Sequence, residues 1–208
     1  KLHAAADSFA PNWQRALAAM ALTTVAGGFI FGAMTFVVPR YFEISMINLS
    51  TSVAVTGLLA SVVYAVASFS QMAVGWLIDH HSPKLVLLAM ALGQVLFIYL
   101  ASQFSDLALF FAMLLAMSFV FGQIPITDTI LSRYVPDVWR GRVMSVKFML
   151  NLTVGASVLP VCGFILQAGY AMTSLFAMMS AIAVLVALAA LVLPQQDEAH
   201  RLDHAPAE

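Results

Sequence analysis

Long, uncharged apolar stretches alternate with short polar segments along most of the chain. A helix needs about 20 apolar residues to cross the roughly 30 Å hydrocarbon core of a bilayer, so each long stretch predicts one crossing. The run from Phe148 to Gln196 carries no charge and is long enough for two crossings, with a turn at Gln167 to Tyr170. The pattern predicts six transmembrane helices, at about residues 16–38, 53–78, 85–102, 107–131, 143–166 and 172–193.

The composition supports this interpretation. Hydrophobic residues make up 62% of the chain and charged residues 9%, against roughly a quarter charged in a soluble domain. The predicted fold class is an all-α membrane protein, a bundle of six transmembrane helices. No basic cluster of the kind that binds nucleic acid is present, and we expect no cofactor and no metal ion. The single cysteine, Cys162, lies in an apolar stretch and excludes an intrachain disulfide.

The basic residues predict the orientation of the bundle. Six crossings place both termini on one side of the membrane, and loops rich in Lys and Arg stay in the cytoplasm. Only Arg40 falls on the side opposite the termini. The others fall on the terminal side: Lys1, Arg15, Lys84, Arg133, Arg140, Arg142, Lys147 and Arg201. We therefore expect a multi-pass protein of the cell (inner) membrane with both termini in the cytoplasm.

The two ends of the chain are polar. Residues 1–15 precede the first apolar run and are interpreted as part of a cytoplasmic loop between two domains. Residues 195–208 are interpreted as a disordered cytoplasmic tail.

Polar side chains inside four of the spans predict a cavity, because polar groups in hydrocarbon persist where they face a bundle interior or water. The third and sixth spans have few such groups and are expected at the periphery. Glycine and proline interrupt the first and fourth spans at corresponding places, which is typical of a transporter's binding site near the membrane midplane; for Gly27 and Gly28, close helix packing is an equally good explanation. The predicted cavity residues are Gly28, Phe31, Gly32, Gln71, Gln123, Pro125 and Asn151.

A short sequence repeat relates the two halves of the chain. Phe29-Ile30-Phe31-Gly32 in the first span resembles the segment Phe119 to Gly122 in the fourth. Each stands in the leading helix of a set of three helices, so the repeat indicates two three-helix units of inverted topology. A match of four residues in a chain with 15 Phe and 11 Gly can also arise by chance.

The loop after the second span carries a recognisable motif. In GWLIDHHSPK, residues 75–84, Gly75, Asp79 and Lys84 match the Gly-x-x-x-Asp-Arg-x-Gly-Arg-Arg motif of the major facilitator superfamily. His80, Ser82 and Pro83 depart from it, as is common in C-terminal copies. The loop RYVPDVWRGRVMSVKF, residues 133–148, is similar to the basic loop that opens the fifth helix of C-terminal halves in bacterial members.

The chain thus resembles the C-terminal six-helix half of a twelve-helix transporter of this superfamily. The resemblance implies a missing N-terminal half, a lipid bilayer and a small-molecule substrate as partners, and alternating access, with an ion gradient, such as protons, as the driving force. It also implies a conformational latch made of Gly75, Asp79, Lys84, Arg140 and Arg142, in which the aspartate lies at a helix N-terminus of the other half.

Two charges fall inside predicted spans. Asp128 and Lys147 are nearly equidistant from the middle of the loop around Val138, so antiparallel helices would place them at similar depth. An ion pair is expected, because unpaired charges are costly in a membrane. Two interpretations stay open: a coupling site at which Asp128 binds and releases a proton, or a permanent structural pair, with Lys147 also able to reach the headgroups.

Other functions fit the sequence less well. An intramembrane serine protease needs a base at membrane depth, and all five histidines lie in loops or tails. No voltage sensor or filter signature points to a channel. A membrane receptor or sensor on the same fold is the remaining alternative to an ion-coupled carrier, for which efflux is a hypothesis drawn from the aromatic and Met-rich composition. We expect no enzymatic activity.

Overall fold

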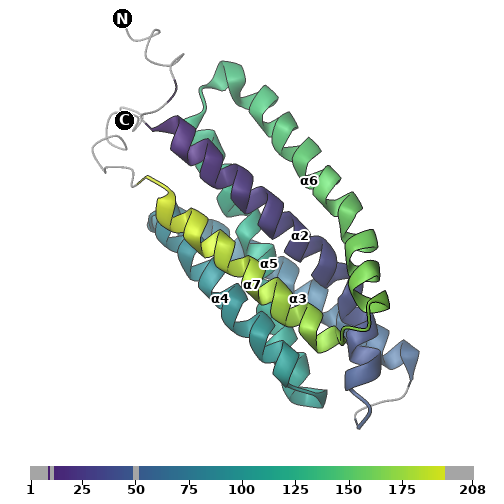
Figure 1. The fold of residues 1–208 in the computed structure, drawn as a ribbon. Helices are drawn as coiled ribbons and strands as arrows, with labels where there is room; N and C mark the ends of the chain where they lie inside the picture. The colour runs from purple at the N-terminus through teal and green to yellow at the C-terminus, as the bar shows by residue number, and fades with distance from the viewer. Residues whose placement is uncertain (1–8, 10–11, 49–51, 195–208) are drawn as a thin grey trace, which may run out of the picture.

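The computed structural model describes residues 9, 12–48 and 52–194. This part of the chain folds as six long α-helices and contains no strand (Figure 1). They are α2 (Trp13–Ser45), α3 (Val53–His80), α4 (Pro83–Gln103), α5 (Asp106–Tyr134), α6 (Asp137–Gln167) and α7 (Met172–Val192). All six are long and apolar enough to cross a membrane, which confirms the predicted fold class. Residues 1–8, 10–11 and 195–208, with Lys1 and Arg201, lie outside the described residues.

Five of the six helices extend beyond the predicted spans, because those spans counted only apolar residues, and α7 ends one residue before its predicted end. The largest difference is at α2, which continues to Ser45 rather than ending near residue 38. The next largest is at α6, which begins at Asp137 rather than near residue 143. Pro136 precedes it in an extended conformation, and Asp137 pairs with Arg140 one turn later at 2.6 Å. Arg140 and Arg142 therefore lie on the first turns of a helix rather than in a loop. At the start of α4, Pro83 occupies the first helical position.

The predicted turn between the last two helices is present. Gly169 has a φ of +88°, a left-handed conformation that glycine adopts without steric cost. Its N–H donates to the carbonyl of Leu166 at 3.1 Å, which closes the end of α6 and lets α7 run back antiparallel.

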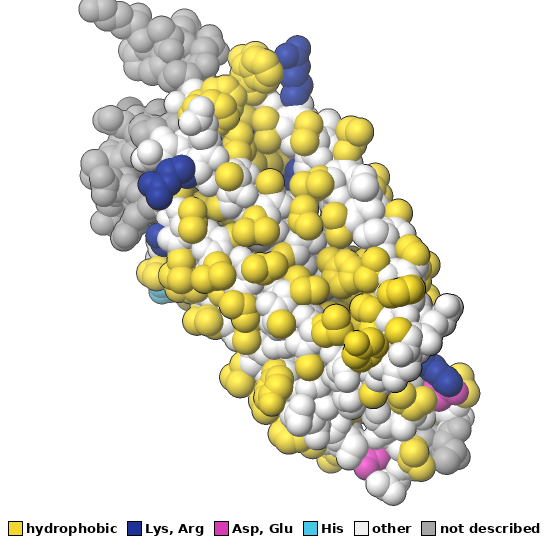
Figure 2. Space-filling view, viewed as in Figure 1, with side chains coloured by type: hydrophobic (Ala, Val, Ile, Leu, Met, Phe, Trp, Pro, Cys, Tyr) yellow, Lys and Arg dark blue, Asp and Glu magenta, His cyan; other side chains and the backbone are white. Residues whose placement is uncertain are grey.

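The start of α2, the end of α5, the start of α6 and the end of α7 meet at one end of the bundle. Phe9, just before α2, contacts the Trp139 ring of α6 at 6.3 Å between centroids, and the Tyr134 hydroxyl of α5 donates to the carbonyl of Pro194 at 3.0 Å. Most of the visible Lys and Arg side chains gather at this end, while hydrophobic side chains cover the middle of the face (Figure 2). We call it the basic end.

The two three-helix units pack with an approximate twofold relation. Each leading helix, α2 or α5, packs against the other and against the second and third helices of a unit other than its own: α2 against α6 and α7, α5 against α3 and α4. The repeated motif lies at the centre of this arrangement. Phe31 and its counterpart Phe121 contact each other, with ring centroids 5.2 Å apart.

The two motif glycines make equivalent crossings. A Cβ added at Gly32 of α2 would lie 3.0 Å from Val158 of α6, and one added at Gly122 of α5 would lie 2.9 Å from Val74 of α3. Small residues thus let each leading helix approach the second helix of the opposite unit. These matched contacts agree with two related units of inverted topology.

Burial is uneven across the helices. In Figure 1, α4 and α7 lie together on one side of the bundle and α6 lies on the other. Among the residues described for α6, only Val158 and Cys162 are buried. The other faces of α6 carry exposed large hydrophobic side chains such as Phe148, Leu152 and Phe164. This helix is therefore held to the bundle chiefly along α2.

Candidate functional site

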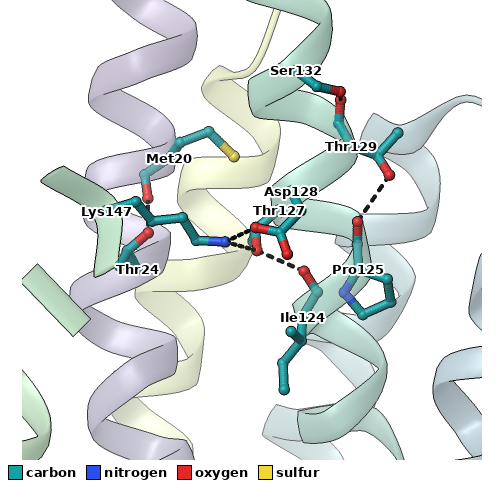
Figure 3. A network of polar contacts seen from close by, with 9 residues as sticks. All are labelled: Met20, Thr24, Ile124, Pro125, Thr127, Asp128, Thr129, Ser132 and Lys147. Carbon is teal, nitrogen blue, oxygen red and sulfur yellow. Dashed lines mark hydrogen bonds and ion pairs between the residues drawn. The ribbon is translucent and has the colours of Figure 1, made fainter. Parts of the chain in front are cut away.

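An ion pair joins α5 and α6 within the apolar part of the bundle. The Lys147 ammonium donates to Asp128 Oδ1 and to Thr127 Oγ1, the latter at 3.0 Å (Figure 3). The side chain of Lys147 is 16% exposed and that of Asp128 is 42% exposed, so the carboxylate is the more accessible partner. The structure thus brings together the two charges that the sequence placed at similar depth.

The hydroxyl of Thr127 fixes the direction of this interaction. It donates to the carbonyl of Ile124 at 2.9 Å and accepts from Lys147, so both roles of the hydroxyl are used. One turn before Asp128, Pro125 cannot donate the helical bond to the carbonyl four residues earlier, which loosens α5 beside the pair.

The pair borders a cavity of about 130 Å³ between α2, α5 and α6. Asp128 and Lys147 are its only charged lining residues; the rest of the wall consists of hydroxyl, amide, aromatic and aliphatic side chains and two glycines. The lining residues are Thr23, Thr24, Gly27, Gly28, Phe31, Val120, Gln123, Ile124, Thr127, Asp128, Lys147, Phe148 and Asn151. The site can therefore combine hydrogen bonds with the charges of one ion pair.

Two adjacent glycines bring amide side chains close to α2. The space of a side chain at Gly27 is filled by the amide of Gln123, and a Cβ at Gly28 would lie 2.5 Å from Asn151 Oδ1. The glycines thus serve close packing, and what packs against them are two polar groups of the cavity wall. The structure shows the close-packing alternative, and the binding-site interpretation stays a prediction.

A second glutamine lies behind the cavity wall. Gln94 of α4 is fully buried, and its Nε2 donates to Gln123 Oε1 at 2.5 Å and to the carbonyl of Phe119 at 3.2 Å. The sequence indicated a peripheral helix here, but Gln94 points inward to α5. Opposite Gln123, the hydroxyl of Thr23 is fully buried and has no hydrogen-bond partner among the described residues.

An apolar groove continues from this cavity toward the basic end. Its volume is about 360 Å³, and it lies between α2, α5 and the first half of α6. Thr24, Thr127 and Lys147 line both spaces. The remaining groove residues are Leu17, Met20, Ala21, Leu131, Trp139, Arg142, Val143, Val146 and Leu150. The cavity and the groove together form one continuous space with a polar end and an apolar end.

Several predicted cavity residues lie elsewhere. Gly28, Phe31, Gln123 and Asn151 line the cavity, whereas Gly32, Gln71 and Pro125 do not. Gly32 packs against α6, as described above. Gln71 is half-buried on α3 and forms no hydrogen bond to any described residue.

The predicted latch residues lie at the basic end, but not as one cluster. Asp79 is exposed in the last turn of α3, with Gly75 one turn earlier on the same helix. Lys84 instead donates to the carbonyls of Leu191 and Leu193 at 3.0 and 2.6 Å, so it caps the C-terminal end of α7.

The two arginines of the predicted latch have local partners. Arg140 bonds Asp137 and the carbonyl of Ser132, the latter at 3.2 Å. Arg142 lies over the Trp139 ring, 4.9 Å from its centroid. Neither forms a hydrogen bond or an ion pair with Asp79, so the predicted latch residues do not interact as one group within the described part of the chain.

Some cavity residues were absent from the predicted set: Thr23, Thr24, Thr127, Phe148 and, behind the wall, Gln94. A glutamine in mid-span is a usable signal, since a buried amide needs partners. Threonine gives a weaker signal, because its hydroxyl can bond to its own helix, as Thr24 does to the carbonyl of Met20 at 2.8 Å. No group of His, Cys, Asp or Glu able to hold a metal ion occurs among the residues described.

Comparison with known proteins identifies the family. A sequence model described as the Major Facilitator Superfamily matches residues 16–208. The chain belongs to the Major Facilitator Superfamily. A comparison with curated protein sequences gives no match for this superfamily chain.

Solved structures of transporters share the fold of this Major Facilitator Superfamily chain. One is the Escherichia coli fucose:proton symporter FucP, in a single-residue variant, with a TM-score of 0.71 and 18% identity over 90% of this chain and 44% of that one. Another is FucP in an outward conformation, with a TM-score of 0.72 and 18% identity over 89% of this chain and 43% of that one. The chain therefore spans less than half the length of these structures, and corresponds to a six-helix half of the transporter fold.

Proposed function

We propose that this chain is one half of an ion-coupled secondary transporter that moves a small molecule across the membrane by alternating access. The observation that carries the proposal is the Asp128–Lys147 pair, which borders a polar cavity within a transporter fold. A second six-helix unit would pack against α6, whose outward faces are apolar and exposed, and would cover the open side of the cavity. The exposed faces of α3 and α6 support such a partner.

Protons are the proposed coupling ion. Asp128 and Lys147 together carry no net charge, so the cavity is neutral while the pair is formed. When Asp128 takes up a proton, the attraction for Lys147 is lost and the cavity gains one positive charge. No other charged group lines this cavity among the described residues; in the adjoining groove the one further charge is Arg142. Protonation therefore changes both the field in the cavity and the link between α5 and α6.

We further propose that the basic end faces the cytoplasm, in the inner membrane, with both termini on that side. The concentration of Lys and Arg there supports this orientation. Asp79, exposed at that end, is then free to lie at a helix N-terminus of the second unit and act as the latch, together with Gly75, while Lys84 stabilises the adjoining helix end.

The test of coupling is Asp128→Asn in the assembled transporter, comprising this chain and its second unit, reconstituted in liposomes with an imposed pH gradient. We expect substrate binding to persist and gradient-driven accumulation to fall by at least about tenfold, with loss of pH dependence. Asp137→Asn is the matched control, because that carboxylate is 82% exposed and pairs with Arg140 at the surface. Unchanged, pH-dependent accumulation by Asp128→Asn would rule out the coupling role. Binding without any transport by the unaltered protein would favour a receptor.

A further inference from the structure

We infer that the 130 Å³ cavity is a subsite for the carboxylate of a small amphipathic acid, with the apolar part of that acid in the adjoining groove, and that Gln94 positions the amide that recognises it. The inference rests on the proposed transport function and names its substrate class. Four features of the site support it: the orientation of Gln123, an unpartnered hydroxyl, the charge balance and the shape of the two connected spaces.

Gln94 determines which end of the Gln123 amide faces the cavity. A primary amide nitrogen has two N–H groups, and Gln94 Nε2 uses one for Phe119 and the other for Gln123 Oε1. The oxygen of Gln123 is thereby occupied, and its Nε2 lies on the opposite side, against Gly27 of α2. Gln123 is 6% exposed and lines the cavity, so it offers a hydrogen-bond donor to a ligand.

Thr23 supplies a second group without a partner. Its residue is fully buried, it lines the same cavity one turn from Gly27, and Oγ1 has no hydrogen bond within the described part of the chain. A buried hydroxyl without a hydrogen-bond partner is destabilising, and an oxygen atom of a bound ligand can supply that partner. Asn151 lines the same cavity, and the Nδ2 of its side-chain amide can act as a further donor. Gln123, Thr23 and Asn151 can therefore each donate to an acceptor atom of a ligand.

The charge balance favours an acid over a neutral acceptor. The cavity is neutral with Asp128 ionised, and protonation of Asp128 frees the Lys147 ammonium for a ligand carboxylate. The bound state then holds Lys147, one carboxylate and a neutral Asp128, again with no net charge. A carboxylate and a proton that enter together leave no uncompensated charge in the apolar bundle, where such a charge is strongly unfavourable.

The groove specifies the rest of the molecule. Beyond Lys147 the walls are mostly apolar, with Met20, Leu131, Val143 and Val146 among them and Arg142 as the one further charged residue, in a volume of about 360 Å³. Because Thr24, Thr127 and Lys147 border both spaces, a carboxylate at Lys147 places its attached carbons at the entrance of the groove. Moving the apolar part of the acid from water into this groove is favoured by the hydrophobic effect.

Binding can be measured directly by isothermal titration calorimetry on the purified assembled protein. Three probes share one apolar body and differ in the polar group: 3-phenylpropionate, 3-phenylpropionamide and 3-phenylpropylamine. We expect the acid to bind at least about tenfold more tightly than the amide, and the amine to bind most weakly. Titration in buffers of different ionisation enthalpy should show about one proton taken up with the acid, and none in Asp128→Asn.

Two substitutions test the positioning role. Gln94→Met keeps the volume but frees Gln123 to rotate, so the preference for acid over amine should fall about fivefold. Thr23→Val removes the hydroxyl and should weaken binding of the acid by a similar factor. The matched controls are Gln103→Met at the far end of α4 and Thr35→Val on α2, neither of which lines the cavity or the groove. Both controls should bind as the unaltered protein does.

The outcomes separate this inference from the proposed function. Amide or amine binding as tight as that of the acid, binding of none of the three probes, or an unchanged acid-to-amine ratio in a folded Gln94→Met protein would each overturn the substrate assignment. Selective acid binding without transport in liposomes would leave the assignment standing and overturn the carrier function instead.

Discussion

The ion pair at the cavity allows a quantitative test of how strongly the fold depends on it. The perturbation is a double-mutant cycle of Asp128→Asn and Lys147→Met. Two unit charges 4 Å apart attract by about 1 kcal/mol in water and about 4 kcal/mol at an effective dielectric constant of 20. Asp128 is 42% exposed and Lys147 16% exposed, so the pair lies between these limits. After discounting for screening at Asp128, we expect a coupling energy of about 1–2 kcal/mol.

The two single substitutions should differ. Asp128→Asn leaves a charged ammonium that is largely shielded from water, and should lower the free energy of unfolding by about 2–3 kcal/mol. Lys147→Met leaves a half-exposed carboxylate that can bind a proton, and should cost only about 1 kcal/mol. Denaturant titration of the assembled protein in detergent measures the free energy of unfolding of the unaltered protein, the two single variants and the double variant.

The control is the Arg40–Glu43 pair of α2, at 2.6 Å with side chains 59% and 33% exposed. The corresponding cycle there should give a coupling energy below about 0.5 kcal/mol, as expected of a surface pair within one helix. Strictly additive effects at Asp128 and Lys147, or a larger loss from Lys147→Met than from Asp128→Asn, would refute the reasoning.

Two further predictions concern the scaffold. Gly93→Ala should destabilise the bundle by about 1–3 kcal/mol, because a Cβ there would lie 2.5–2.7 Å from ring atoms of Phe119. The control is Gly57→Ala, which has open space around it and should stabilise the bundle by up to about 1 kcal/mol. Equal effects of the two substitutions in thermal unfolding would contradict this account. Lys84→Met removes two hydrogen bonds to the carbonyls at the end of α7. It should lower the free energy of unfolding by about 1 kcal/mol and raise the rate of hydrogen exchange in the last turn of α7. An unchanged exchange rate at Leu193 would show that the cap is unimportant.

The helices and their order could be predicted from the sequence because the membrane imposes a simple rule: each crossing is a long stretch without charges. The pairing of Asp128 with Lys147 could also be predicted, because the two residues are nearly equally far along the chain from the short turn that joins their helices. The polar first turn of α6 was not, because a count of apolar residues passes over Arg140 and Arg142 although they are helical.

Side-chain direction set the limit for the site. Gln94 and Gln71 both stand in the middle of a span, yet the first points to Gln123 and the second lines neither the cavity nor the groove. Which face of a helix is buried depends on its rotation against its neighbours, and nearly uniform apolar helices carry little information about that rotation. The repeated motif fared better: Phe31 meets Phe121 because equivalent positions of two inverted units fall on the axis that relates them.

The attachment of α6 along α2 gives the bundle a mechanical property. α6 approaches α2 closely at two places, Val158 against Gly32 and Asn151 against Gly28. Lys147 lies eleven residues before Val158, about 16 Å along the helix axis. A tilt of α6 by roughly 10° about the Val158–Gly32 contact would move Lys147 about 3 Å sideways, enough to separate it from Asp128. A tilt of that size would break the Asp128–Lys147 contact, which would link the charge state of the pair to the position of α6.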